Sequence, residues 1–162
     1  MKTDENRLTI IGKAFHCLME FSGDIASLNY MKAKKLISKF PLSSGDQNLV
    51  LKSIEKLTNS VECMNLLNSD STHILIESEW INEFGEVIRP DRVDFNIPEG
   101  KVNIIDFKWR VSSAQKNSYV LQMLKYQRVI ELNYPEMTVK SFLVSSEAQI
   151  FYIKGNQLLH LR

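Results

Sequence analysis

The chain has 162 residues, of which 44% are hydrophobic and 24% charged, and its formal net charge is +1. This length predicts one domain with a substantial core, and the composition is that of a globular protein, which excludes a largely disordered chain. The near-neutral charge excludes a protein that coats nucleic acid through bulk charge alone, although a local basic face remains possible.

The cysteine content and the absence of long apolar runs bear on the compartment. Cys17 and Cys63 are too few for a disulfide framework and show no CxxC spacing. We therefore expect two reduced thiols, which cannot supply the four thiolates of an iron–sulfur cluster. No stretch reaches the roughly 18 apolar residues of a membrane span, and the amino terminus lacks the residue order of a signal peptide. The sequence predicts a cytoplasmic protein that does not bind a membrane.

The first part of the chain is predicted to be helical, because apolar residues recur there at helical spacing. Four helices are expected, over residues 10–19, 30–40, about 44–57 and 61–67. Pro41 is expected to end the second helix, and Ser43 or Ser44 to cap the third. These helices form an N-terminal helical segment, residues 1–70.

After Asp70 the apolar residues change to a period of two, which is typical of strands. Three strands are expected over residues 73–80, 87–97 and 101–108, linked by turns at 84–86 and 98–100 into an antiparallel meander. Further along, we expect a helix at 119–133, strands at 139–144 and 150–153, and a turn at Gly155-Asn156 into a short tail. The order predicts a single domain, residues 1–162, with a mixed α/β fold of α+β character, in which residues 71–162 supply the sheet and its helix.

Ionised side chains in the apolar strands need a partner, because burying an unpaired charge is costly. Residues two apart in a strand share a face, so Asp106 and Lys108 are expected to project to the same side. Asp91 lies on the preceding strand and can sit opposite them, whereas strict alternation turns Asp94 to the other face. Pro90 makes a bulge or an edge position plausible, and a bulge would weaken the choice of Asp91 over Asp94.

Two carboxylates that converge with a backbone carbonyl offer the hard oxygen ligands that Mg²⁺ or Mn²⁺ prefers. Such an ion acidifies a bound water and neutralises charge when a phosphodiester is attacked. Lys108 could orient or deprotonate the water, or stabilise the charged transition state, and the sequence does not choose among these roles. By itself, an aspartate and a lysine two apart on a strand are more often a solvated pair, so this interpretation depends on the other motifs.

Four motifs follow one another along the chain: Gly12 and His16 in GKAFHCLM, Asp91 in RPDRV, Asp106 and Lys108 in IIDFKWR, and Gln122 and Tyr126 in QMLKYQ. Their order resembles the RecB-like branch of the PD-(D/E)XK nuclease superfamily, whose pattern runs GxxxH, aspartate, DxK and QxxxY. The run EWINEFGEVIRPDRV followed by IIDFKWR resembles the carboxy-terminal nuclease domains of UvrD/Rep-type helicases. The resemblance covers nearly the entire chain.

This resemblance implies a restriction-endonuclease-like core, in which a central mixed sheet with a three-stranded meander is flanked by helices. It implies a Mg²⁺- or Mn²⁺-dependent deoxyribonuclease of DNA recombination and repair. The partners would be DNA and helicase domains, either in the same longer chain or in a partner subunit. The implied metal ligands are His16, Asp91, Asp106 and the backbone carbonyl of Phe107. The implied catalytic group comprises Asp91, Asp106, Lys108, Gln122 and Tyr126.

Other candidate residues surround these motifs. Gln122 and Tyr126 are four apart on one helix, so their polar tips can reach the same groove, although an ordinary amphipathic helix has the same spacing. The resemblance implies that they lie beside the DNA. Glu79 is expected to face solvent rather than support a metal site, and Trp109 to pack in the core rather than stack on a base. Six cations could contact phosphates, and we expect at most half of them to do so: Arg89, Arg92, Arg110, Lys116, Lys125 and Arg128, of which Arg110 and Lys125 are assigned to DNA.

Two other functions remain open. A DNA-binding or structural module of a helicase–nuclease complex would keep the fold without cleaving DNA, although the presence of every motif residue argues against such decay. A free-standing endonuclease of the restriction type is less attractive, because the resemblance is to helicase-fused domains. The chain contains no GxxxxGK[ST] loop, so we do not expect it to be an ATP-hydrolysing motor itself.

Overall fold

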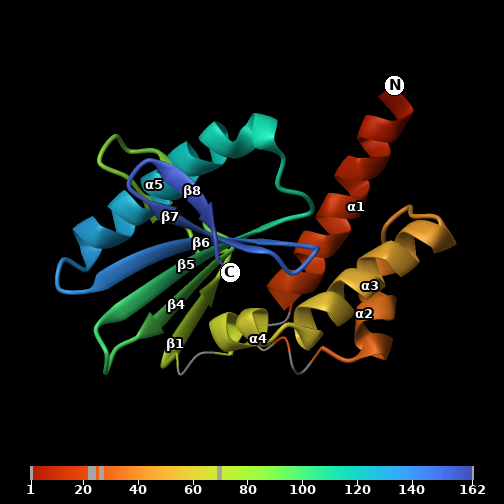
Figure 1. The fold of residues 1–162 in the computed structure, drawn as a ribbon, viewed down its shortest axis with the longest axis horizontal. Coiled ribbons are helices and arrows are strands. Elements are labelled where there is room, and N and C mark those ends of the chain that lie inside the picture. Colours follow the sequence, from red (N-terminus) through yellow and green to blue (C-terminus); the bar gives the residue numbers. More distant parts are fainter. Residues whose placement is uncertain (1, 22–24, 26–27, 69–70, 162) are drawn as a thin grey trace. The chain divides into compact units, whose positions relative to one another are not determined.

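The computed structural model describes residues 2–21, 25, 28–68 and 71–161 (Figure 1). Within these residues the fold is mixed α/β, with five α-helices and a central mixed sheet of six strands. The chain forms two compact units. The helical unit contains the four helices within residues 2–67 with segments 107–110 and 145–148, and the sheet unit contains the rest of the sheet with the helix Lys116–Asn133. The predicted change of pattern at Asp70 lies outside the described residues.

The helical unit contains α1 (Lys2–Phe21), α2 (Tyr30–Ile37), α3 (Ser44–Asn59) and α4 (Val61–Leu67). The cap of α3 is Ser43, whose hydroxyl accepts a hydrogen bond from the N–H of Asp46 at 3.1 Å. Helix α2 ends three residues earlier than predicted, because the backbone tightens before Pro41: the N–H groups of Lys39 and Phe40 donate to carbonyls three residues back.

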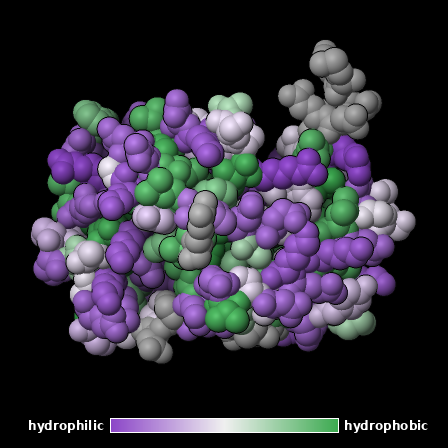
Figure 2. Space-filling view, viewed as in Figure 1, coloured by the Kyte–Doolittle hydropathy of each residue, from purple (hydrophilic) through white to green (hydrophobic). Residues whose placement is uncertain are grey.

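The helices bury the apolar stripes that predicted them. Helix α1 packs against α2 and α3 through side chains that are almost fully buried. These include Ile11, Phe15 and Leu18 of α1, Ile37 of α2, and Val50 and Leu57 of α3. Hydrophilic residues are interspersed with hydrophobic ones over the face shown in Figure 2. No helix in the described part of the chain combines the length and apolar composition needed to cross a membrane.

The sheet has the strand order β1-β4-β5-β6-β7-β8. Its strands are β1 (His73–Ile76), β4 (Arg92–Asn96), β5 (Lys101–Lys108), β6 (Thr138–Ser145), β7 (Ile150–Lys154) and β8 (Gln157–His160). Strands β1, β4 and β5 form the predicted antiparallel meander. The N–H of Thr138 donates to the carbonyl of Gly100, and that of Ser146 to the carbonyl of Lys108. The residue numbers rise in both segments from the first of these bonds to the second, so β5 and β6 run parallel.

The first hairpin of the meander is interrupted, which corrects the two long strands expected at 73–80 and 87–97. Beyond β1 and β4, the short strands β2 (Trp80–Ile81) and β3 (Val87–Ile88) form a separate ladder in the same register. In the break, Glu77 has a left-handed φ of +49°, and Pro90 has no N–H to donate. The N–H of Glu77 nevertheless donates to the carbonyl of Asp91 at 3.0 Å, which keeps the strands aligned.

Helix α5 (Lys116–Asn133) connects β5 to β6 and covers one face of the sheet (Figure 1). Its buried residues pack against side chains of three strands. The contacting residues are Tyr119, Met123, Tyr126 and Ile130 of α5 with Val93, Phe95, Val102, Ile104 and Leu143 of the sheet. The short tail expected after Gly155 is instead strand β8, paired with β7 through a tight turn in which Gly155 has a φ of +57°.

Candidate functional site

Asp91 and Asp106 lie side by side in the sheet unit. Strands β4 and β5 pair antiparallel with Arg92 opposite Ile105, and extending this register by one residue places Asp91 opposite Asp106. Directly opposed residues point to the same face, with Cβ atoms roughly 4.5–5.5 Å apart. Both aspartates are buried, at 8% and 2% exposure. Val93 and Ile104 each lie two residues from one of these aspartates and cluster with buried residues of α5, so both aspartates lie on the face that α5 covers.

Asp94 lies on the opposite face and belongs to a buried ion pair. The Nε atom of Arg92 donates to Oδ1 of Asp94 at 2.7 Å, and the two side chains are 2% and 0% exposed. Burial raises the pKa of the Asp94 carboxyl, and the hydrogen bond from Arg92 opposes this effect. Strand β4 pairs continuously from Arg92 to Asn96, so no bulge in this stretch reverses the two faces. Because it is buried, Arg92 cannot contact DNA, which corrects its place among the candidate phosphate contacts.

Gln122 and Tyr126 join α5 to the backbone beside Asp91. The Nε2 group of Gln122 donates to the Tyr126 hydroxyl at 2.8 Å, and that hydroxyl donates to the carbonyl of Arg89 at 3.3 Å. Burial raises the pKa of Tyr126 to about 12, and the charges of Asp106, Asp91 and Glu77 act in the same direction. The phenol is therefore neutral at physiological pH, so it acts as a hydrogen-bond donor and not as a base.

Glu77 is a third carboxylate of this region that the sequence analysis did not select. Its N–H bonds the carbonyl of Asp91, so the residue stands opposite Asp91 on the other side of the hairpin. Alternation along a strand puts Glu77 and Glu79 on the same face and does not separate them. The signal that separates them is the hairpin register, which pairs Glu77 with Asp91 and Glu79 with Arg89. Glu79 is 59% exposed and bonds Arg89 at 2.6 Å, so it faces solvent as expected.

Lys108 ends strand β5 two residues after Asp106, so alternation along the strand puts both on one face. Lys108 is half-buried, and its carbonyl accepts a hydrogen bond from the N–H of Ser146 at 3.1 Å. Phe107 is buried and points to the other face. Arg110, the predicted DNA contact two residues further on, is exposed.

His16 belongs to the helical unit, whereas Asp91 and Asp106 belong to the sheet unit. Within its own unit, His16 is half-buried on α1, one turn after Gly12. The neighbouring ring of Phe15 meets Trp109 edge to face, with centroids 5.7 Å apart. Trp109 thus packs against α1, which agrees with the prediction that it packs in the core. Its Nε1 atom is buried and has no hydrogen-bond partner within the described structure.

Gly12 itself is not required by the packing of α1. A Cβ atom added there would lie 3.8 Å from the Cβ of Trp109, which is an ordinary contact distance. We expect Gly12→Ala to raise the free energy of unfolding by about 0.5–1 kcal/mol, because glycine costs that much in a helix interior. Urea unfolding followed by circular dichroism measures the change. Gly85→Ala, at a φ of +79°, is the contrasting control and should destabilise. A clear loss of stability in Gly12→Ala would contradict this expectation.

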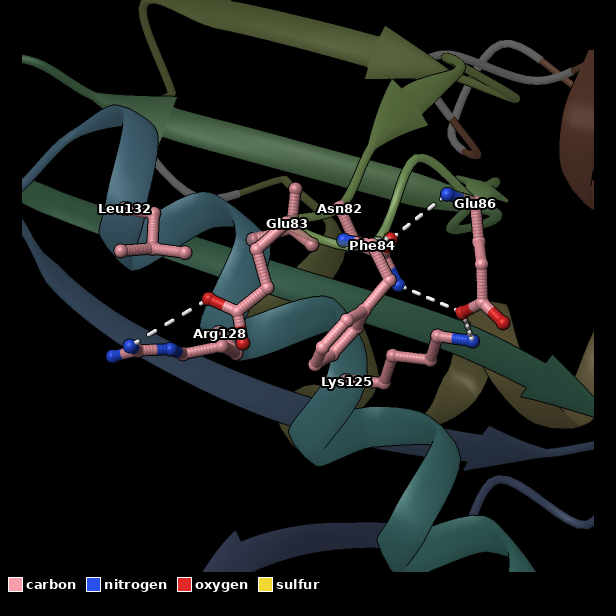
Figure 3. Close-up of a pocket in the computed structure, with 8 residues that line it drawn as sticks. Asn82, Glu83, Phe84, Glu86, Lys125, Arg128 and Leu132 are labelled. Carbon is pink, nitrogen blue, oxygen red and sulfur yellow. Dashed lines mark hydrogen bonds and ion pairs between the residues drawn. The ribbon is translucent and has the colours of Figure 1, made fainter.

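Two further cations of α5 contact acidic residues of the turn between β2 and β3 (Figure 3). Lys125 pairs with Glu86 at 2.5 Å, and Arg128 with Glu83 at 3.8 Å. With the exposed ring of Phe84, they line a cleft of about 420 Å³. The predicted DNA contact Lys125 is therefore already engaged by a carboxylate, which a phosphate would have to displace.

The arrangement of the possible ligand side chains limits how the protein could bind a metal ion. Among the described residues, no three His, Cys, Asp or Glu side chains are placed to hold one ion together. The sheet unit offers the facing pair Asp91 and Asp106, and Mg²⁺ commonly takes backbone carbonyls and water at its remaining coordination positions. Two buried carboxylates that face each other repel unless a cation or a proton lies near them.

No protein-family model matches the sequence, and a search of the curated proteins finds no relative. The chemistry must therefore be argued from the residues themselves. These are two facing buried carboxylates, a lysine two positions along one of their strands, and a neutral phenol held beside them. Such a group can bind a hard cation and position a water or a phosphate oxygen.

Proposed function

We propose that this chain is a metal-dependent deoxyribonuclease of the RecB-like branch of the PD-(D/E)XK superfamily, with a restriction-endonuclease-like core. The observation that carries the proposal is the position of Asp91 opposite Asp106, both buried on the face of the sheet that α5 covers. The element order also supports it, since a meander is followed by a helix and a parallel strand. The wider role, in DNA recombination and repair beside helicase domains, is part of the same proposal.

Asp91 and Asp106 would hold Mg²⁺ or Mn²⁺, and the carbonyl of Phe107 and the imidazole of His16 are the further ligands that the motifs predict. The residues fit the ion, because paired carboxylates are the hard oxygen ligands that it prefers. When bound, such an ion acts as a Lewis acid toward a phosphodiester and acidifies water.

The chain's own polar groups would position the reactants. The ammonium group of Lys108 can orient or deprotonate the attacking water, or stabilise charge that develops on the phosphate. The Tyr126 hydroxyl, which accepts a hydrogen bond from Gln122, donates to the carbonyl of Arg89 and so fixes the backbone that leads to Asp91. Because the phenol stays neutral, it adds no negative charge that would repel a phosphate.

One observation favours a second function, a DNA-binding or structural module without cleavage. The described residues contain no set of three ligating side chains, and a site with only two carboxylates binds Mg²⁺ weakly unless other groups or the substrate complete it. The two functions differ in whether bound DNA is cut when Mg²⁺ or Mn²⁺ is present.

The deciding experiment incubates the purified protein with end-labelled linear DNA and with circular DNA in Mg²⁺, Mn²⁺ or EDTA. We expect cleavage with either metal ion, no cleavage in EDTA, and none with the Asp106→Ala variant in any condition. DNA binding without cleavage in both metal ions would favour the silent module. Cleavage that persists in EDTA or in Asp106→Ala would overturn the proposed site.

A further inference from the structure

Arg89 stands in the break of the first hairpin, two residues before Asp91. Its backbone is fixed, because its carbonyl accepts the hydrogen bond from the Tyr126 hydroxyl at 3.3 Å. Its side chain is 53% exposed, so the guanidinium reaches solvent two residues along the chain from Asp91. A charged group with an anchored backbone and an exposed tip is well suited to contact a ligand that approaches the site.

Two glutamates of the opposite strand hold this guanidinium. Nη2 of Arg89 lies 2.6 Å from Oε1 of Glu79, and Nη1 lies 3.8 Å from Oε2 of Glu77. The hairpin register accounts for both contacts, since Glu79 is opposite Arg89 and Glu77 is the diagonal neighbour. The Glu79 side chain is 59% exposed. Exposed ion pairs are weak, so another anion can replace this glutamate at low cost.

We propose that Arg89 is a phosphate-binding residue of the site, and that Glu79 and Glu77 hold its guanidinium when no nucleic acid is bound. This inference rests on the proposed function, because it takes the ligand to be a nucleic-acid phosphodiester. The planar guanidinium matches two phosphate oxygens as well as it matches a carboxylate. On binding, the phosphate replaces Glu79, and the anchored backbone keeps the contact next to Asp91.

The proposal predicts opposite changes in DNA affinity when Arg89 and Glu79 are replaced. Arg89→Gln removes the phosphate contact and should weaken DNA binding by about 5–8-fold at 0.1 M salt, because one contact contributes a salt slope of about 0.7–0.9. Glu79→Gln removes the competing anion and should strengthen binding. The pair Lys101–Glu99 is a matched control at the other end of β5, with side chains 53% and 52% exposed. Lys101→Gln and Glu99→Gln should change binding less than twofold.

The experiment measures fluorescence anisotropy of labelled single-stranded and duplex DNA in EDTA, where no metal-dependent cleavage occurs, at several salt concentrations. We expect Arg89→Gln to lower the slope of log K against log salt by nearly one unit, and Glu79→Gln to bind more tightly than wild type. Circular dichroism verifies that the variants are folded, and Glu79→Gln tests the proposal even if Arg89→Gln is unstable.

Three outcomes would overturn the inference. If Arg89→Gln binds as Lys101→Gln does while the wild type binds DNA, the phosphate role of Arg89 is wrong and the proposed function stands. If Glu79→Gln binds more weakly than wild type, the pair has a structural role and does not compete with DNA. If the wild type binds neither the single-stranded nor the duplex DNA, this inference and the proposed function both fail.

Discussion

Replacing Asp94 with alanine is expected to lower the free energy of unfolding by about 3–5 kcal/mol. Arg92 and Asp94 are both almost completely buried, with a hydrogen bond of 2.7 Å between Nε and Oδ1. Removing the carboxylate leaves the guanidinium in the sheet without this counter-charge, and water cannot replace it there. Urea unfolding measures the change, which should appear as a lower midpoint with an unchanged m value.

Two control variants distinguish the stability cost of an unpaired buried charge from the cost of losing side-chain atoms. Glu99→Ala removes the carboxylate of the exposed Lys101–Glu99 pair and should change stability by no more than about 0.5 kcal/mol. The double replacement Arg92→Met with Asp94→Leu removes both charges and should recover most of the loss, because a buried ion pair roughly balances its own desolvation. If Asp94→Ala were as stable as Glu99→Ala, the buried pair would not exist in the folded protein.

The same measurement distinguishes the two aspartates that the sequence placed three residues apart. Asp94 serves the fold on one face of β4, whereas Asp91 faces Asp106 on the other. Strand β4 pairs continuously from Arg92 to Asn96, so its two faces do not reverse in this stretch, and the metal-binding role of Asp91 stays a prediction. What the sequence did not provide was the partner of Asp94. Nothing in a one-dimensional pattern distinguishes the buried Arg92 from the exposed Arg89.

Strand β5 was predicted with its observed bounds, Lys101–Lys108, because a turn glycine precedes it and its apolar residues are continuous. The break in the first hairpin was not predicted, since glutamate rarely adopts the left-handed φ that Glu77 has. Strand β8 was missed for a different reason. Its four residues carry too short a pattern to identify, and their conformation depends on pairing with β7.

In the candidate site, too, spacing within one element could be predicted from the sequence, whereas contacts between elements could not. Asp106 with Lys108, and Gln122 with Tyr126, follow from spacing within one element. Glu77 was missed because its place beside Asp91 depends on a hairpin register set by a distant turn. The ion pair between Lys125 and Glu86 joins residues from separate elements, and no periodicity reports it. Spacing within one element therefore predicts candidate residues for the proposed chemistry, whereas the carboxylates near them depend on contacts between elements.

Replacing Lys108 with alanine is expected to slow DNA cleavage by about 10²–10⁴-fold, the usual contribution of a positioned proton donor or acceptor. Lys108 follows Asp106 on the same face of β5, so its ammonium group would act beside the proposed cation without ligating it. Binding of Mn²⁺, measured by calorimetry, should therefore persist in Lys108→Ala. Asp106→Asn, which removes one of the two facing carboxylates, should lose both Mn²⁺ binding and cleavage.

The two variants also differ in stability, which keeps the test independent of activity. Added Mn²⁺ should stabilise the wild type and Lys108→Ala against urea unfolding but not Asp106→Asn, because a ligand that binds only the folded protein raises its stability. Lys101→Ala, at the other end of the same strand, should cleave at the wild-type rate. Wild-type turnover in Lys108→Ala would remove that residue from the mechanism. Loss of Mn²⁺ binding in Lys108→Ala would instead show that the lysine supports the structure of the cation site.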